Sequence, residues 1–204
     1  MAELASRDLL AFHDGRLAIK DWSKSDAQVH TAGLWQAIED NHRHNCSLWD
    51  QEDLARRRNV SDSEIAGNKR AIDHHNQRRN DAIERIDEHL LNALAGVTPK
   101  QGARLNSETA GAMCDRLSIL SLKVHHMRIQ TVRTDVDRDH IDTCKARLAR
   151  LIEQRADLAG CLDRLLAECA RGESTFKVYR QFKMYNDPKL NPAVYGEKGG
   201  RAVG

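Results

Sequence analysis

The sequence has little of what a fold built from many short strands needs. Its 204 residues include 3 prolines and 12 glycines, and tryptophan, tyrosine and phenylalanine occur three times each. A sandwich or barrel requires more turn-forming and aromatic residues than this. Because 40% of the residues are hydrophobic, the chain can still bury a core, which argues against disorder throughout. An all-helical domain therefore fits the composition best.

The features of several other protein classes are also missing. The 32 basic and 30 acidic residues nearly balance, which leaves no broad basic surface for nucleic acid. No stretch approaches 18 apolar residues, and acidic residues occupy the start of the chain, where a signal peptide would be basic and then apolar. The five cysteines include no C-x-x-C pair, which argues against disulfides or a zinc knuckle. We therefore expect a cytoplasmic protein without nucleic-acid or membrane partners.

Helix-start and helix-stop signals divide most of the chain into four long helices. Ser61 and Glu64 form a capping box, in which each side chain can accept a hydrogen bond from the other residue's backbone amide. Gly96 and Pro99 end the helix that begins there. By the same criteria, the four helices are expected at about residues 25–58, 61–95, 107–133 and 135–171.

A fifth, shorter helix is expected at about residues 173–186, before the prolines at positions 188 and 192. Arg180, Lys183 and Asp187 would project from one side of it, which predicts a lid docked on the bundle. The sequence thus predicts a single all-α domain, a helical bundle, over residues 1–195. Its core should span about residues 25–187, and residues 196–204 should form a flexible tail.

Polar residues interrupt the apolar stripes of two of these helices. On the first helix, the stripe between Trp35 and Trp49 contains His42 and Asn45. On the second, polar residues border the isoleucine stripe at Lys69, Asp73, Asn76, Asn80, Glu84 and Asp87. Charged groups are rarely buried without partners. The pattern therefore indicates either an ion-pair network that fixes helix register or a polar pocket between helices, and the number of interruptions favours the pocket.

Five segments resemble bacterial proteins catalogued as domain of unknown function 4254: LWDQEDLAR (48–56), NQRRNDAIE (76–84), SETAG (107–111), DRLSIL (115–120) and YRQFKMYNDP (179–188). The resemblance covers about residues 35–195 and implies a soluble bacterial helical domain, without naming a reaction. Its motif residues coincide with those selected by the stripes, and they also include Asp81, Asp115, Arg116 and Asn186.

The predicted function is that of a small-molecule enzyme or ligand-binding protein for a polar substrate. The substrate is either phosphorylated, such as a nucleotide or activated sugar, or unphosphorylated, because acids, amides and bases suit both. Carboxylates would transfer protons or hold magnesium, the candidate cofactor. The predicted catalytic residues are Glu52, Asp53, Asp81 and Glu84, of which Glu52, Asp81 and Glu84 are also the predicted metal ligands. The predicted substrate contacts are Arg56, Lys69, Asp73, Asn76, Asn80, Arg116, Lys123, Arg180, Lys183, Asn186 and Asp187.

Two alternatives remain open at the level of sequence. Glu39 and His42 have the E-x-x-H spacing of carboxylate-bridged di-iron bundles, which would make His42 a metal ligand, although no second E-x-x-H occurs. The bundle could instead be a non-catalytic assembly or binding module. A homodimer would then form through the apolar third helix and the aromatic carboxyl-terminal segment.

Overall fold

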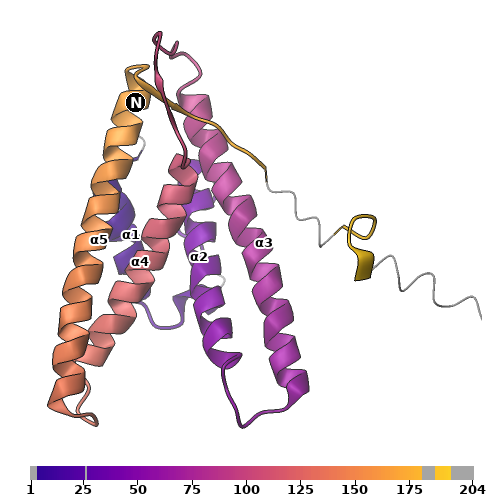
Figure 1. Ribbon diagram of the computed structural model, residues 1–204, viewed down its shortest axis with the longest axis vertical. Coiled ribbons are helices and arrows are strands. Elements are labelled where there is room, and N and C mark those ends of the chain that lie inside the picture. Colours follow the sequence, from indigo (N-terminus) through magenta and orange to yellow (C-terminus); the bar gives the residue numbers. More distant parts are fainter. Residues whose placement is uncertain (1–3, 26, 181–186, 194–204) are drawn as a thin grey trace, which may run out of the picture.

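The structure, a computed structural model, describes residues 4–25, 27–180 and 187–193 (Figure 1). Its described part is dominated by helices, which confirms the predicted all-α bundle. The helices are α1 (Ser6–Leu17), the short 3-10 helix η1 (Trp22–Lys24), α2 (Gly33–Leu54), α3 (Asp62–Ala93), α4 (Ala110–Thr131) and α5 (Arg138–Ala170). Two short strands complete the described elements, β1 (Arg104–Asn106) and β2 (Ser174–Phe176).

The four long helices form two antiparallel hairpins, α2 with α3 and α4 with α5 (Figure 1). The predicted capping box at Ser61 is present, and Thr109 and Asp137 cap α4 and α5. Helix α4 contacts all four other α-helices, and its Leu117 is fully buried. The apolar face of α4, which the assembly alternative offered to a second copy, is therefore largely covered within the chain.

Helix α1 is the longest of the elements that the sequence did not predict. Its N-cap residue, Ala5, has no side chain that could accept a hydrogen bond. The cap comes instead from Asp163 of α5, whose carboxylate accepts hydrogen bonds from the Ser6 amide at 2.8 Å and the Ser6 hydroxyl at 2.7 Å. Leu9 of α1 is fully buried in the main core, so the core begins before the predicted residue 25. A cap donated across 157 residues leaves no local signal.

The prediction of a short helix at about residues 173–186 is wrong where the structure describes it. Gly172 adopts a positive φ of 70° after α5, and the chain then turns back as β2. Strand β2 pairs in parallel with β1, with Ser174 opposite Arg104, and Phe176 is buried in the main core. Residues 177–180 form no regular element, and residues 181–186, with the rest of the predicted lid, lie outside the described residues.

Helix α2 begins later than predicted, at Gly33 rather than near residue 25. The buried Glu39 carboxylate explains this difference, because it accepts hydrogen bonds from the backbone amides of Val29 and His30. Because Glu39, one to two turns inside the helix, binds the amides of Val29 and His30, the segment that contains them does not become helical.

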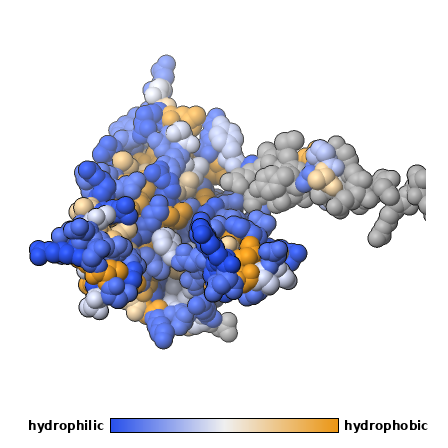
Figure 2. All heavy atoms as spheres, turned by 60° about the horizontal axis from the view of Figure 1, so that its bottom comes forward, coloured by the Kyte–Doolittle hydropathy of each residue, from blue (hydrophilic) through white to orange (hydrophobic). Residues whose placement is uncertain are grey.

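Hydrophilic side chains cover most of the face shown in Figure 2, where apolar residues form small, separate patches. Among the described residues, no helix combines the length and the hydropathy needed to cross a membrane.

Candidate functional site

A buried polar network joins α2 to α4 in the middle of the bundle. We call Asn41, His42, Asn45, Asp115 and Ser118 the central polar network; all five are buried. The side-chain amides of Asn41 and Asn45 both donate to Asp115 Oδ1, at 2.8 and 2.9 Å. Ser118 Oγ lies 2.8 Å from His42 Nδ1 and 3.0 Å from Asn45 Nδ2. The spacing of three and four residues on each helix brings these groups to the same interface.

The histidine of this network lies among other rings. His13 of α1 stacks on His42 with ring centroids 4.4 Å apart, and Trp22 stacks on it at 5.6 Å. The pKa of His42 is lowered to about 3, chiefly by burial; the backbone of His13 acts in the opposite direction, and the nearby Arg16 and Arg43 add to the lowering. Burial likewise lowers the pKa of His13 well below its usual value, with further lowering by His42 and Arg155. Both imidazoles are therefore neutral at pH 7.

The di-iron alternative gains no support from this arrangement. His42 Nδ1 is engaged by Ser118, and Glu39 binds backbone amides and Arg43. Within the described part of the chain, no group of three or more His, Cys, Asp and Glu side chains is placed to hold a metal ion.

A pocket opens beside the network, between α2, α3 and α4. This inner pocket has a volume of about 290 Å³. It contains three predicted site residues and one member of the network, and it is lined by Asn45, Leu48, Trp49, Glu52, Asp53, Arg56, Arg79, Ile119 and Leu122.

The inner pocket has hydrogen-bond donors in its two arginines, Arg79 and Arg56, whereas the Asn45 amide nitrogen already donates within the central polar network. Arg79 of α3 lies with its Nε 3.9 Å from Asp115 Oδ1, too far for a hydrogen bond, and this Nε has no hydrogen-bond partner among the described residues. Asn45 belongs to the pocket and to the network at once. Asn45 interrupts the apolar stripe of the first predicted helix, but neither Asn45 nor Arg79 was predicted as a site residue.

Glu52 is the centre of the charged rim of the inner pocket. Its carboxylate lies 2.8 Å from Nη1 of Arg56, just after the end of α2, and 3.9 Å from Lys69 Nζ on α3. Asp53, next to it, is exposed. The structure thus brings together four predicted residues at the carboxyl end of α2.

The other predicted acids lie elsewhere. Asp81 accepts a hydrogen bond from Gln77 at 2.7 Å. Glu84 lies 3.8 Å from Arg180, which donates to Glu88 at 3.0 Å. Neither acid lines the inner pocket, so Glu52, Asp81 and Glu84 do not form a preassembled magnesium site.

The remaining predicted contacts are dispersed. Arg116 is paired with Glu108 at 2.7 Å, and Asp187 accepts a hydrogen bond from the backbone of Lys189. On α3, Asp73 is exposed, Asn76 is half-buried and Asn80 is buried, and none of the three lines the inner pocket. Lys183 and Asn186 lie outside the described residues.

A larger cavity, which we call the basic groove, shares Trp49 and Asp53 with the inner pocket. It has a volume of about 560 Å³ and lies between α2, α4 and the first half of α5. Its lining is Trp49, Asp53, Lys123, His126, Met127, Gln130, Arg147, Arg150 and Leu151. Lys123 was predicted as a substrate contact, whereas the arginines were missed because the stripe of α5 looked purely structural.

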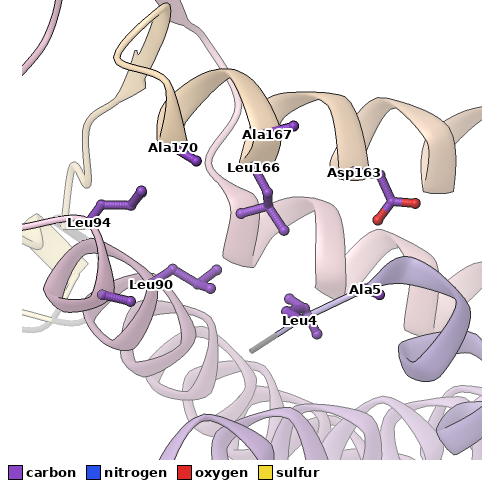
Figure 3. Close-up of a pocket in the computed structure, with 9 residues that line it drawn as sticks. Leu4, Ala5, Leu90, Leu94, Asp163, Leu166, Ala167 and Ala170 are labelled. Carbon is purple, nitrogen blue, oxygen red and sulfur yellow. The ribbon is translucent and has the colours of Figure 1, made fainter. Parts of the chain in front are cut away.

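The cavity at the opposite end of the bundle is different in kind. Figure 3 shows Leu90, Leu94, Leu166 and Leu4 lining it, with Asp163 at one side. Its volume is about 260 Å³. Because Asp163, the charged residue of this lining, already caps α1, the cavity offers hydrophobic surface but no free polar group among its described residues.

Comparison with protein families gives one result. The family described as "Protein of unknown function (DUF4254)" matches residues 35–178, well over half of the chain. The matched range runs from the start of α2 past β2 and contains the inner pocket and the basic groove. No curated protein and no solved structure gives a significant match.

Proposed function

Because the chain belongs to the DUF4254 family, whose description names no activity, we propose its function from the site itself. The protein is a cytoplasmic enzyme or ligand-binding protein of bacterial metabolism, and its substrate is a polar, phosphorylated small molecule such as a nucleotide or an activated sugar. The observation that carries this proposal is the inner pocket, where Glu52 and Asp53 of α2, and Arg56 just after that helix, meet Arg79 of α3.

The donors in the inner pocket suit a phosphate or another anionic group. A guanidinium presents several N–H donors in a fixed plane, which matches phosphate oxygens. Arg79 Nε has no hydrogen-bond partner among the described residues, and the Arg56 side chain is 69% exposed, so it can turn toward a ligand. The Asn45 amide nitrogen at the pocket wall already donates to Asp115 and Ser118, so the two arginines are the donors for the ligand.

The acids have a complementary role. Glu52 and Asp53 accept hydrogen bonds from substrate hydroxyls, and one of them takes a proton if a reaction occurs. In the ligand-free protein, Arg56 and Lys69 neutralise Glu52. A bound phosphate competes for the same cations and thereby frees the Glu52 carboxylate for its substrate.

Calorimetric titration tests the binding proposal. The ligands are ADP, UDP-glucose and glucose 6-phosphate, each with and without magnesium. At least one should bind, and Arg79→Gln should weaken it about tenfold or more, because a charge-assisted hydrogen bond is lost. Arg57→Gln is the matched control, since Arg57 lies next to Arg56 but does not line the inner pocket. Equal affinities in the two variants would contradict the proposal.

Phosphorus NMR then separates an enzyme from a binding protein. Incubation of the protein with the ligand that binds should produce a new phosphorus signal if catalysis occurs. Glu52→Gln and Asp53→Asn should slow its appearance while binding is retained. Binding without any turnover would assign the protein to the ligand-binding class.

A further inference from the structure

The basic groove is built from two facing rows of side chains. On α4, Lys123, His126, Met127 and Gln130 share one face at spacings of three and four residues. On α5, Arg147, Arg150 and Leu151 share another. The carboxyl-terminal part of α2 closes the groove with Trp49 and Asp53. Cationic groups therefore approach the groove from two different helices.

The charges of the groove are unbalanced. Lys123, Arg147 and Arg150 face a single acid, Asp53. Arg150 is paired with Glu153 at 2.7 Å, but Lys123 and Arg147 form no ion pair within the described part of the chain. Unpaired cations on two sides of a cavity attract a ligand with more than one negative charge.

Much of the remaining lining of the basic groove is apolar or aromatic. Trp49 stacks on His126 with ring centroids 4.4 Å apart and nearly parallel planes, at 6°. Met127 and Leu151 extend this surface. An apolar, planar group gains from contact with such a surface, whereas a free inorganic ion does not.

We propose that the basic groove binds the nucleoside diphosphate part of the ligand, with the diphosphate between Lys123 and Arg147 and the base against the apolar lining. This inference rests on the proposed function and makes it more specific. Because Trp49 and Asp53 line both cavities, a ligand in the groove can extend into the inner pocket. The group attached to the diphosphate then meets Glu52, Arg56 and Arg79, which makes a nucleotide sugar the substrate class.

Calorimetric titration of the full chain with ADP tests the groove directly. Lys123→Gln and Arg147→Gln should each weaken ADP binding about tenfold, and the double variant more. Adenosine, which has no phosphate, should bind equally weakly to all variants, and rising salt should weaken ADP binding. Arg138→Gln is the matched control, because Arg138 is a 92% exposed arginine of α5 outside the groove.

The outcomes separate this inference from the proposed function. ADP binding that depends on Arg147 but not on Arg138 supports the groove. No binding of ADP or pyrophosphate, or equal affinities in Arg147→Gln and Arg138→Gln, overturns it. If UDP-glucose binding depends on Arg79 while Arg147→Gln has no effect, the inner pocket stands and only the groove assignment fails. Melting curves of each variant confirm that it is folded, as expected for exposed side chains.

Discussion

At the scale of single residues, the centre of the bundle combines neutral histidines with a buried acid. Asp115 receives two amide hydrogen bonds, so its carboxylate is satisfied without a directly hydrogen-bonded base. His13 and His42 keep their rings stacked and uncharged because burial penalises the imidazolium form. This part of the network therefore holds α1, α2 and α4 together, while Asn45 also reaches the inner pocket.

The lowered histidine pKa values predict loss of stability in acid. The unfolded chain protonates these imidazoles near pH 6.5, whereas folded His42 resists protonation until about pH 3. The unfolded state thus binds more protons in this window, so the free energy of unfolding falls as the pH drops from 6.5 toward 3. One histidine contributes a slope of about 1.4 kcal/mol per pH unit. Urea denaturation of His42→Gln between pH 7 and 4.5 should show a shallower decline than the wild type.

His89→Gln is the control for that measurement, because His89 is exposed on α3 and its substitution should leave the wild-type slope unchanged.

Asp87 changes the pH dependence of stability in the opposite direction to His42. Burial raises its pKa to about 6, so its contribution to stability increases as the pH falls from 6 toward its unfolded value near 4. Comparison of variants at each pH cancels this effect. If the free energy of unfolding of His42→Gln falls with pH as steeply as that of the wild type, folded His42 is not the neutral, buried group described above.

At the scale of elements, α3 and α4 make a close helix–helix contact at Gly111. Asp87 Oδ1 accepts a hydrogen bond from the backbone amide of Gly111 at 2.6 Å. A Cβ atom at position 111 would lie 2.6 Å from the carbonyl oxygen of Ile83 and 2.8 Å from Asp87 Cγ. Only glycine allows this approach of the two helices.

Gly111→Ala should therefore lower the free energy of unfolding by about 1–3 kcal/mol, because backbone atoms must move to relieve the overlap. Gly160→Ala on α5 is the matched control, since a Cβ there meets no atom within 4 Å. It should instead stabilise the protein by up to about 1 kcal/mol, as alanine favours a helix more than glycine does. If chemical denaturation shows equal effects of the two substitutions, glycine is not required for the close contact between α3 and α4.

The sequence was sufficient for elements whose signals are local. The Ser61 capping box, the acidic start of α5 and the glycine that ends it all lie within a few residues of the helix end they determine. Helix α1, β2 and the start of α2 depend on distant partners instead: Asp163, the pairing with β1, and Glu39. A pattern read along one helix cannot supply such contacts.

The same limit applies to the candidate site. Interrupted stripes correctly indicated polar groups at helix interfaces, and Glu52, Asp53 and Arg56 line one pocket. Helical periodicity predicts which face of a helix a residue lies on, but not how far α2, α3 and α4 are shifted relative to one another along the bundle axis. Asp81 and Glu84 were therefore grouped with Glu52 although the structure separates them. Arg147 and Arg150 were missed because they lie beside a regular apolar stripe.

At the scale of the whole molecule, both candidate binding cavities lie towards the same end of the bundle. The inner pocket and the basic groove both involve the carboxyl end of α2, near the turns of the two hairpins (Figure 1). The opposite end contains the apolar cavity of Figure 3, the strands and the cap of α1. Under the proposed function, the ligand would bind at the end that holds the turns, away from the strands and the cap of α1.

Thermal melting of the wild type and Arg79→Gln, each with and without ADP and UDP-glucose, tests this account most directly. A ligand at one hundred times its dissociation constant stabilises by about 2.7 kcal/mol, which for a chain of this size raises the melting temperature by about 5–10 °C. With UDP-glucose we predict this shift in the wild type and its reduction to about half or less in Arg79→Gln, because a tenfold weaker affinity leaves about 1.4 kcal/mol. The ADP shift, which the basic groove supplies, should be retained in Arg79→Gln, and the ligand-free melting temperatures should agree within about 2 °C. No ligand shift, together with a much lower melting temperature for Arg79→Gln, would show that the polar residues only hold the helices in register.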